Sequence, residues 1–122
     1  SFAIANRYFL IIDLIWEWYY YMINKTDKSE INKANALVNK YLCAFIFGKF
    51  LIKPKNQKGI EVSQNQYAKL CGLSSSTITK LKESAGYDIP MSTIYNICRH
   101  EKYSLEQFFE EFETKYGVNI PL

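Results

Sequence analysis

Glycine and proline are scarce in this sequence, with five glycines and three prolines among 122 residues. This scarcity excludes collagen-like and linker-like chains, argues against β architectures with many turns, and favours helices. The three cysteines are an odd number and we see no secretory signal, so we expect the reducing cytoplasm rather than a disulfide scaffold. Hydrophobic residues make up 48% of the chain and charged residues 22%, the composition of one ordinary globular domain.

Groups that catalyse reactions or bind metals are also few. The sequence contains no nucleophile motif, no glycine-rich phosphate loop and no paired carboxylates. The single histidine, His100, has only Cys98 nearby, which is too few ligands for zinc, and we expect it on the surface or at a helix end. Four glutamates are expected on a solvated helix face, namely Glu106, Glu110, Glu111 and Glu113. We therefore expect no enzymatic activity, metal, cofactor or small-molecule ligand.

The most apolar stretch, residues 8–23, is not expected to span a membrane. A span needs roughly 20 apolar residues, whereas this run is shorter and contains Asp13 and Glu17, which are costly at the bilayer centre. Helical spacing gathers these two with Tyr20 and Asn24 on one narrow polar stripe. Because the rest of the circumference is apolar, either the chain's own domain or a second subunit must cover this helix.

Capping residues divide the remainder into helices and loops. Asp27 with Glu30 predicts a helix start after a polar break at residues 24–27. This helix, over residues 28–52, should end near Pro54 because the residue before a proline avoids the α region. A basic loop follows over residues 53–62. Further helices are predicted over residues 64–71, about 75–84, from 92 onward and 105–116, with caps at Ser63, Ser92 and Ser104 and a stop at Gly117.

Two of these short helices meet at Gly72 and make a helix-turn-helix candidate. Their steep crossing requires a small residue in the first helix where the second packs on it, and Ala68 meets that demand. Helical spacing places five apolar side chains on the inner faces, namely Tyr67, Cys71, Leu73, Ile78 and Leu81. No convincing strand is visible, so the predicted fold class is all-α.

The stretch SQNQYAKLCGLSSSTITKLKE, residues 63–83, resembles the lambda-repressor-like (Xre-type) family of helix-turn-helix DNA-binding proteins. The resemblance also takes in residues 47–50, residues 90–92 with Ile94 and Ile97, and residues 103–105 with Phe108 and Phe109. It implies a five-helix domain over residues 40–122, preceded by a helical extension, residues 1–39. The loops at 53–62 and 84–91 are longer than is usual in the family.

Basic residues concentrate in the middle of the chain. Residues 40–82 contain eight lysines and one glutamate, a net charge of +7. Residues 1–39 balance four basic against four acidic residues, and residues 83–122 contain three basic and seven acidic residues, a net charge of −4. This distribution indicates a face for a polyanion, with a solvated lysine surface as the alternative.

In the family, the second helix of the unit lies in the major groove with its first residues at the base edges. The resemblance therefore implies DNA contacts by the outward residues Ser74, Ser75, Ser76, Thr79, Lys80 and Glu83. Gln64 and the first turn of its helix are placed to meet a backbone phosphate. Further phosphate contacts are expected from Lys49, Lys53, Lys55, Lys58, Lys69 and Lys82.

We therefore expect a sequence-specific regulator of transcription that binds double-stranded DNA as a homodimer and does not associate with a membrane. The alternative is an antitoxin-like or anti-repressor protein-interaction module on the same fold. Residues 2–24 are expected to pack partly on the 28–52 helix and partly across a two-fold interface, or else to be covered within their own domain. The apolar side chains concerned are Phe9, Leu10, Ile12, Leu14, Ile15, Trp16, Trp18 and Tyr19.

Overall fold

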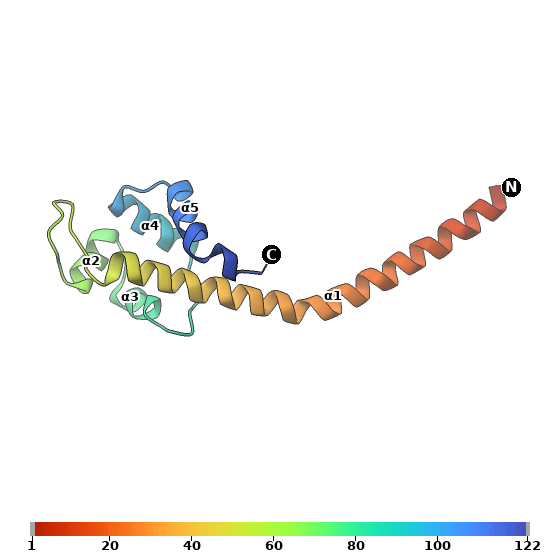
Figure 1. Cartoon of the computed structure of the whole chain (residues 1–122), viewed down its shortest axis with the longest axis horizontal. Helices are drawn as coiled ribbons and strands as arrows, with labels where there is room; N and C mark the ends of the chain where they lie inside the picture. Colours follow the sequence, from red (N-terminus) through yellow and green to blue (C-terminus); the bar gives the residue numbers. More distant parts are fainter. Residues whose placement is uncertain (1, 122) are drawn as a thin grey trace. The chain divides into compact units, whose positions relative to one another are not determined.

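The computed structural model describes the backbone of residues 2–121 and the side chains of residues 11–22 and 28–121. It divides into two compact units, Ser1–Lys33 and Ala34–Leu122. All regular secondary structure in the described part is helical, and one isolated β-bridge joins Lys55 and Glu61 (Figure 1). The all-α prediction is therefore confirmed.

The first helix, α1 (Phe2–Ile46), runs through the predicted polar break. The predicted helix start at Asp27 is thus wrong. The physical reason is that residues 24–27 include no glycine or proline, and polar residues inside a helix each cost only a few tenths of a kcal/mol. The side chains of Phe9, Leu10, Asn24 and Asp27 lie outside the described residues.

The helical path continues past α1 in a single π-helix, η1 (Phe47–Leu51). The Ile52 amide donates to the Phe47 carbonyl at 3.2 Å, which closes the wider turn. The path then stops before Pro54, as predicted.

The two short helices form with the predicted caps. In α2 (Gln64–Cys71), the Ser63 hydroxyl accepts from the Gln66 amide at 3.1 Å. Gly72 then takes a left-handed conformation with φ of 76°, and the Leu73 amide donates to the Ala68 carbonyl at 2.7 Å, which ends the helix. The next helix, α3 (Ser75–Leu81), is capped by Ser74 and ends three residues before the predicted boundary.

The last helices, α4 (Met91–Glu101) and α5 (Leu105–Tyr116), complete this unit, and a short 3₁₀-helix, η2 (Gly117–Asn119), follows at the predicted stop. Ser104 caps α5 as predicted, accepting from the Gln107 amide at 3.0 Å. The predicted cap at Ser92 is wrong, because Pro90 holds the extended cap conformation and Ser92 falls inside the first turn of α4.

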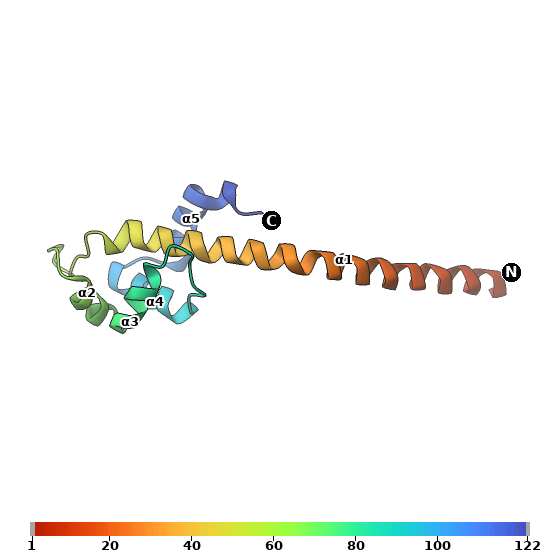
Figure 2. The same ribbon diagram turned by 90° about the horizontal axis from the view of Figure 1, so that it is seen from below.

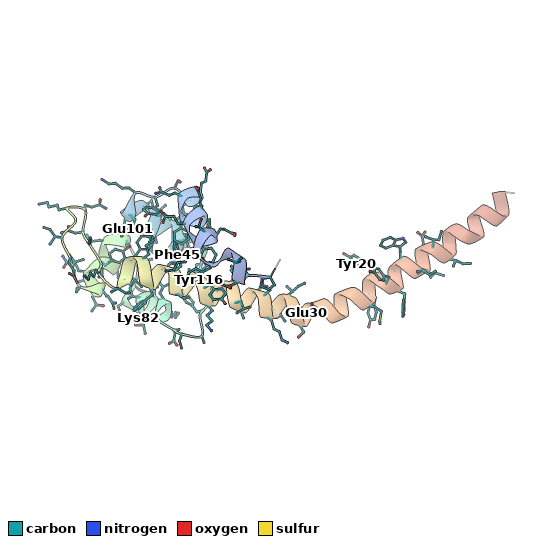
Figure 3. All side chains as sticks on the ribbon, viewed as in Figure 1. Tyr20, Glu30, Phe45, Lys82, Glu101 and Tyr116 are labelled. Carbon is teal, nitrogen blue, oxygen red and sulfur yellow. The ribbon has the colours of Figure 1, made fainter. Side chains whose placement is uncertain are left out.

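The core of the unit Ala34–Leu122 gathers around the end of α1, which passes between α5 and α3 in both views (Figures 1 and 2). The Phe45 ring meets those of Phe108 and Phe112 edge-on, with centroids 5.2 and 5.7 Å apart, and Tyr41 stacks on Tyr116 at 5.1 Å (Figure 3 labels Phe45 and Tyr116). All three cysteines, Cys43, Cys71 and Cys98, are free and buried, as their apolar spacing predicts.

The segment between α3 and α4 lies directly against α1. The Cys43 thiol donates to the Tyr87 carbonyl at 3.9 Å. At Gly86, where φ is 82°, a Cβ atom would stand 2.7 Å from the backbone N and Cα of Lys40. Only glycine permits this approach, because both the conformation and the space exclude a side chain.

We expect Gly86→Ala to lower the free energy of unfolding by about 2–5 kcal/mol, from left-handed strain together with overpacking. Gly72→Ala is the matched control, since Gly72 has nearly the same φ but nothing within 4 Å of the added Cβ. It should cost only the strain, about 1–2 kcal/mol. Urea unfolding measures both, and equal losses would show that the approach to Lys40 contributes nothing.

Lys102 tests the same left-handed strain by a substitution that should stabilise the protein. Among the described residues, it is the one that has a positive φ, 59°, without being a glycine. It ends α4 as Gly72 ends α2, and the Tyr103 amide donates to the Cys98 carbonyl at 2.9 Å. We expect Lys102→Gly to raise the free energy of unfolding by about 1 kcal/mol. Lys102→Ala, which removes the charge but keeps the Cβ, should bring no such gain in urea unfolding.

Candidate nucleic-acid interface

The helix-turn-helix candidate comprises α2, the turn at Gly72 and α3. These two helices contact one another, and α2 also contacts α4. Four residues that were predicted to face inward are at most 2% exposed, namely Tyr67, Ala68, Ile78 and Leu81. Cys71 is also buried, and Leu73 is partly buried against the core. A small buried residue on α2 and buried aliphatic side chains on α3 fit the steep crossing that the motif requires.

The opposite face of α3 is polar and exposed. Ser75, Ser76, Thr79 and Lys80 all lie on this face, and Glu83 is exposed just beyond the helix. Thr79 donates to the Ser75 carbonyl at 3.2 Å, whereas Lys80 has no carboxylate partner among the described residues. The lysine ammonium and the Ser75 hydroxyl are thus available to an external acceptor.

Ser74 is the N-cap residue of α3. Its hydroxyl accepts from the Thr77 amide at 3.2 Å and lies 2.9 Å from the hydroxyls of both Ser76 and Thr77. The Ser74 hydroxyl, which was predicted to reach DNA, is therefore engaged in capping α3. It also forms a hydrogen bond with the Ser76 hydroxyl, so that this second hydroxyl has a partner within the chain.

Of the lysines predicted to neutralise phosphates, Lys49 has an internal partner. Its Nζ lies 2.5 Å from Glu111 Oε2 and 5.2 Å from the centre of the Tyr103 ring. The Glu111 hydrogen bond raises the pKa of Lys49, against the opposing effect of partial burial. The other candidates are exposed and have no ion pair within the described residues: Lys53, Lys55, Lys58, Lys69 and Lys82 (Figure 3 labels Lys82).

Three of those lysines lie in the loop between η1 and α2, and the loop is held in one shape by hydrogen bonds. The Asn56 side chain accepts from the amides of Lys58 and Ile60 at 2.9 and 3.0 Å. Across its base, the Val62 amide donates to the Pro54 carbonyl at 2.9 Å. The loop thus presents its lysines from an ordered hairpin-like turn.

His100 fastens this loop to α4. The Lys55 carbonyl lies 2.8 Å from its Nε2, so this nitrogen donates, and Nδ1 then accepts from the Gln57 side-chain amide at 3.1 Å. Gln57 also donates to the His100 carbonyl at 2.8 Å. His100 lies at the end of α4, which is one of its two predicted positions, and it is only 9% exposed. Burial follows because both ring nitrogens find partners.

Gln64, predicted to meet a phosphate, uses its side-chain amide within the chain. It donates to the Leu51 carbonyl at 2.9 Å and so joins α2 to the end of η1. The link satisfies one of the carbonyls that a helix end leaves without a partner.

Tyr67 and Glu101 make a polar link between α2 and α4. The Tyr67 hydroxyl donates to Glu101 Oε1 at 2.7 Å, and burial raises the pKa of Tyr67. Burial also raises the pKa of the neighbouring Cys71 thiol to about 11, so this thiol is protonated at neutral pH. Within the described ranges, no three His, Cys, Asp or Glu side chains come together as a metal site would require.

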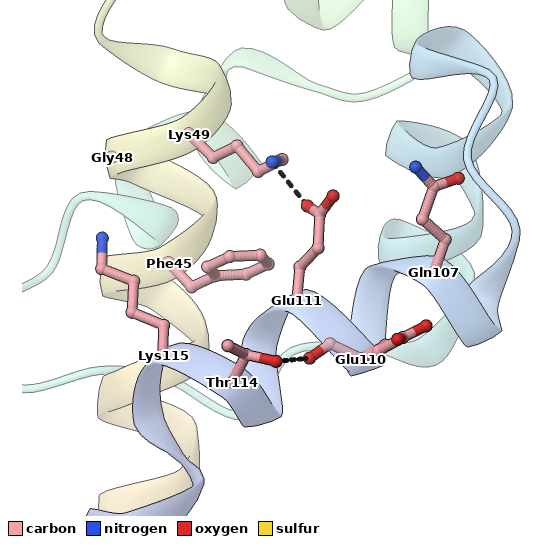
Figure 4. A pocket seen from close by; sticks show the side chains of 8 residues that line it. All are labelled: Phe45, Gly48, Lys49, Gln107, Glu110, Glu111, Thr114 and Lys115. Carbon is pink, nitrogen blue, oxygen red and sulfur yellow. Dashed lines mark hydrogen bonds and ion pairs between the residues drawn. The ribbon is translucent and has the colours of Figure 1, made fainter.

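A hollow of about 550 Å³ opens between η1 and α5 (Figure 4). The Lys49–Glu111 pair lies across it, beside Phe45. This pair neutralises two of the charges that line the hollow, and the other two, Glu110 and Lys115, have no ion pair among the described residues.

Sequence reasoning missed two residues of the candidate interface, Gln57 and His100. They are 43 residues apart, so no local pattern joins them, and only their hydrogen bonds reveal that α4 positions the basic loop.

We expect His100→Ala to lower the free energy of unfolding by about 1–3 kcal/mol, because buried hydrogen-bond partners are left unsatisfied. The amides of Asn56 and Val62 should exchange faster with solvent, since their bonds close the loop that His100 fastens. Arg99→Ala, at the neighbouring exposed position, is the control and should change stability by less than about 0.5 kcal/mol. Unchanged exchange in His100→Ala would mean that the loop holds its shape alone.

Comparisons with protein-family models, curated proteins and solved structures found no match for this chain. Among the helical residues that the structure describes, no stretch combines the length and apolar character that crossing a membrane requires.

Proposed function

We propose that this protein binds double-stranded DNA sequence-specifically, with α3 in the major groove, and thereby regulates transcription. The observation that carries the proposal is the division of α3 into two faces. Ile78 and Leu81 are buried, while Ser75, Thr79 and Lys80 stand exposed on a helix that a tight turn holds against α2. This arrangement suits a helix that must enter a groove while its other side stays anchored.

The exposed groups on α3 suit base edges of different kinds. A lysine ammonium can donate to guanine O6 or N7, and hydroxyls can donate or accept, so Lys80 would supply most of the discrimination. The exposed lysines of α2 and of the loop before it would meet phosphates, which adds affinity without sequence preference. Lys49 would take no part, because Glu111 already pairs with it.

The proposal includes the fold that the resemblance implies. The end of α1 together with α2, α3, α4 and α5 would correspond to the five helices of a lambda-repressor-like domain over residues 40–122. Residues 1–39 would be an extension to it.

A protein-interaction module is the competing function. It is favoured by the acidic outer positions of α5, where Glu106, Glu110 and Glu113 are exposed, and by the lack of arginine on α3. A module of this kind would need no polyanion, so its binding would depend little on salt.

Affinity for bulk duplex DNA across a salt series separates the two functions. DNA binding predicts a log–log slope of about −0.9 for every phosphate neutralised. A slope near zero, or no retention at low salt, would reject the DNA-binding proposal. Selection of bound sites from random duplexes then supplies the preferred sequence.

We expect Lys80→Ala to lose about 1–3 kcal/mol of affinity mainly on the preferred duplex, because a base contact is removed. Lys69→Ala on α2 is the matched control, and a phosphate contact there predicts similar losses on preferred and scrambled duplexes. Duplex titrations measure all four values. If Lys80→Ala weakens both duplexes equally, Lys80 contacts phosphate, and if it weakens neither, α3 does not dock as proposed.

A further inference from the structure

The unit Ser1–Lys33 presents an apolar helix surface to solvent. Ten of its described large apolar side chains are each more than half exposed, namely Ile11, Ile12, Leu14, Ile15, Trp16, Trp18, Tyr19, Tyr20, Tyr21 and Ile31 (Figure 3 labels Tyr20). A contiguous apolar surface of this kind marks an interaction site.

The side chains on one side of this helix follow a seven-residue repeat. Ile11, Ile15 and Trp18 succeed one another at intervals of four and three residues, which is the spacing of a coiled-coil seam. In the sequence the same alternation reaches back to Tyr8 and Ile4, whose side chains lie outside the described residues. The repeat ends after Met22, because the next positions of the series are Lys25, Ser29 and Asn32. Over residues 4–22 its spacing is that of a helix that meets other helices side by side.

The charged residues occupy the positions that such a seam leaves in water. When Ile11 and Trp18 take the d positions and Ile15 the a position, Asp13 falls at f and Glu17 at c. Both carboxylates then point away from the seam, and the like charges of neighbouring copies stay apart.

The apolar surface is too wide for a single partner helix. Ile12, Leu14, Tyr19 and Tyr21 occupy the e and g positions beside the seam, where two-stranded coiled coils carry charge. At 100° per residue, the a, d, e and g side chains together cover about 180° of the circumference. One partner would bury the seam and leave the flanks exposed, whereas a bundle buries both.

We propose that the unit Ser1–Lys33 assembles with the same unit of other copies of this chain into a bundle of more than two helices. A membrane surface is a poorer occupant, because the two charged residues between positions 8 and 24, Asp13 and Glu17, are both acidic. The basic residues of the unit lie outside this apolar stretch, at Arg7, Lys25, Lys28 and Lys33. Helices that lie on anionic membranes carry basic residues on their polar face. The assembly goes beyond the proposed DNA binding and does not depend on it.

Light scattering of the full chain across a dilution series tests the bundle. Each chain has a mass of 14.3 kDa, and the expected particle mass is at least three times larger. The double variant Ile11→Ser with Ile15→Ser should fall to the mass of one chain. The control, Trp16→Ser with Tyr20→Ser, removes at least as much apolar area, but from positions b and f, and should keep the wild-type mass.

Three results would overturn the bundle. One is a wild-type mass of one chain at every concentration. If this single chain also sediments with vesicles of phosphatidylcholine and phosphatidylglycerol, a membrane surface and not other copies covers the helix. Another is a mass of two chains, which would restore the two-fold pair expected from the sequence. The third is an equal loss of mass in both double variants, which would indicate non-specific hydrophobic association. Duplex affinity enters none of these measurements, so failure here is separate from failure of the DNA-binding proposal.

Discussion

Burial of the last turns of α1 holds the other helices of residues 34–122 together. Phe45 and Ile46 are at most 4% exposed, and Phe45 meets aromatic rings of α5 edge-on. Full burial of such a side chain stabilises a fold by about 1.5–3 kcal/mol, more than most single hydrogen bonds contribute. The segment after α3 depends on the same helix, because Gly86 approaches its backbone too closely for any side chain. Since α3 is only seven residues long, its position depends on this packing and not on its own helix propensity.

Two polar contacts join α4 to α2 and to the loop before α2, in addition to the apolar core. The Tyr67–Glu101 hydrogen bond joins α2 to α4, and His100 joins α4 to the loop before α2. Both links start from the last turn of α4. The link from Glu101 reaches α2, and the link from His100 reaches the lysine-containing loop before α2. A buried imidazole with both nitrogens bonded gives a loop one defined shape, because each alternative shape leaves a polar atom without a partner. The lysines differ in whether their charge is neutralised. Lys49 pairs with Glu111, whereas the loop lysines have no ion pair within the described residues.

The two units use aromatic residues in different ways. In residues 34–122 the rings of Tyr41, Phe45, Phe108 and Phe112 stack or meet edge-on inside one core. In residues 11–22 the tryptophans and tyrosines are exposed, and the ring contact between Trp16 and Tyr19 lies along a single helix. A helix that is apolar over most of its circumference is normally buried, and the proposed bundle would bury it against other copies of the same unit.

Local sequence determined much of this protein. The caps Ser63 and Ser104, the turn at Gly72, the ends near Pro54 and Gly117, and the inward positions of Ala68, Ile78 and Leu81 all follow from neighbouring residues, because capping, left-handed turns and helical periodicity act within a few positions. The continuity of α1 was misjudged from the same local signals, since four polar residues are compatible with both a break and a helix. Only the tertiary structure decided that His100 is buried against Lys55, that Glu111 neutralises Lys49 and that Gln64 turns inward to Leu51. These partners stand between 13 and 62 residues apart in the chain, and their meeting depends on how the helices pack.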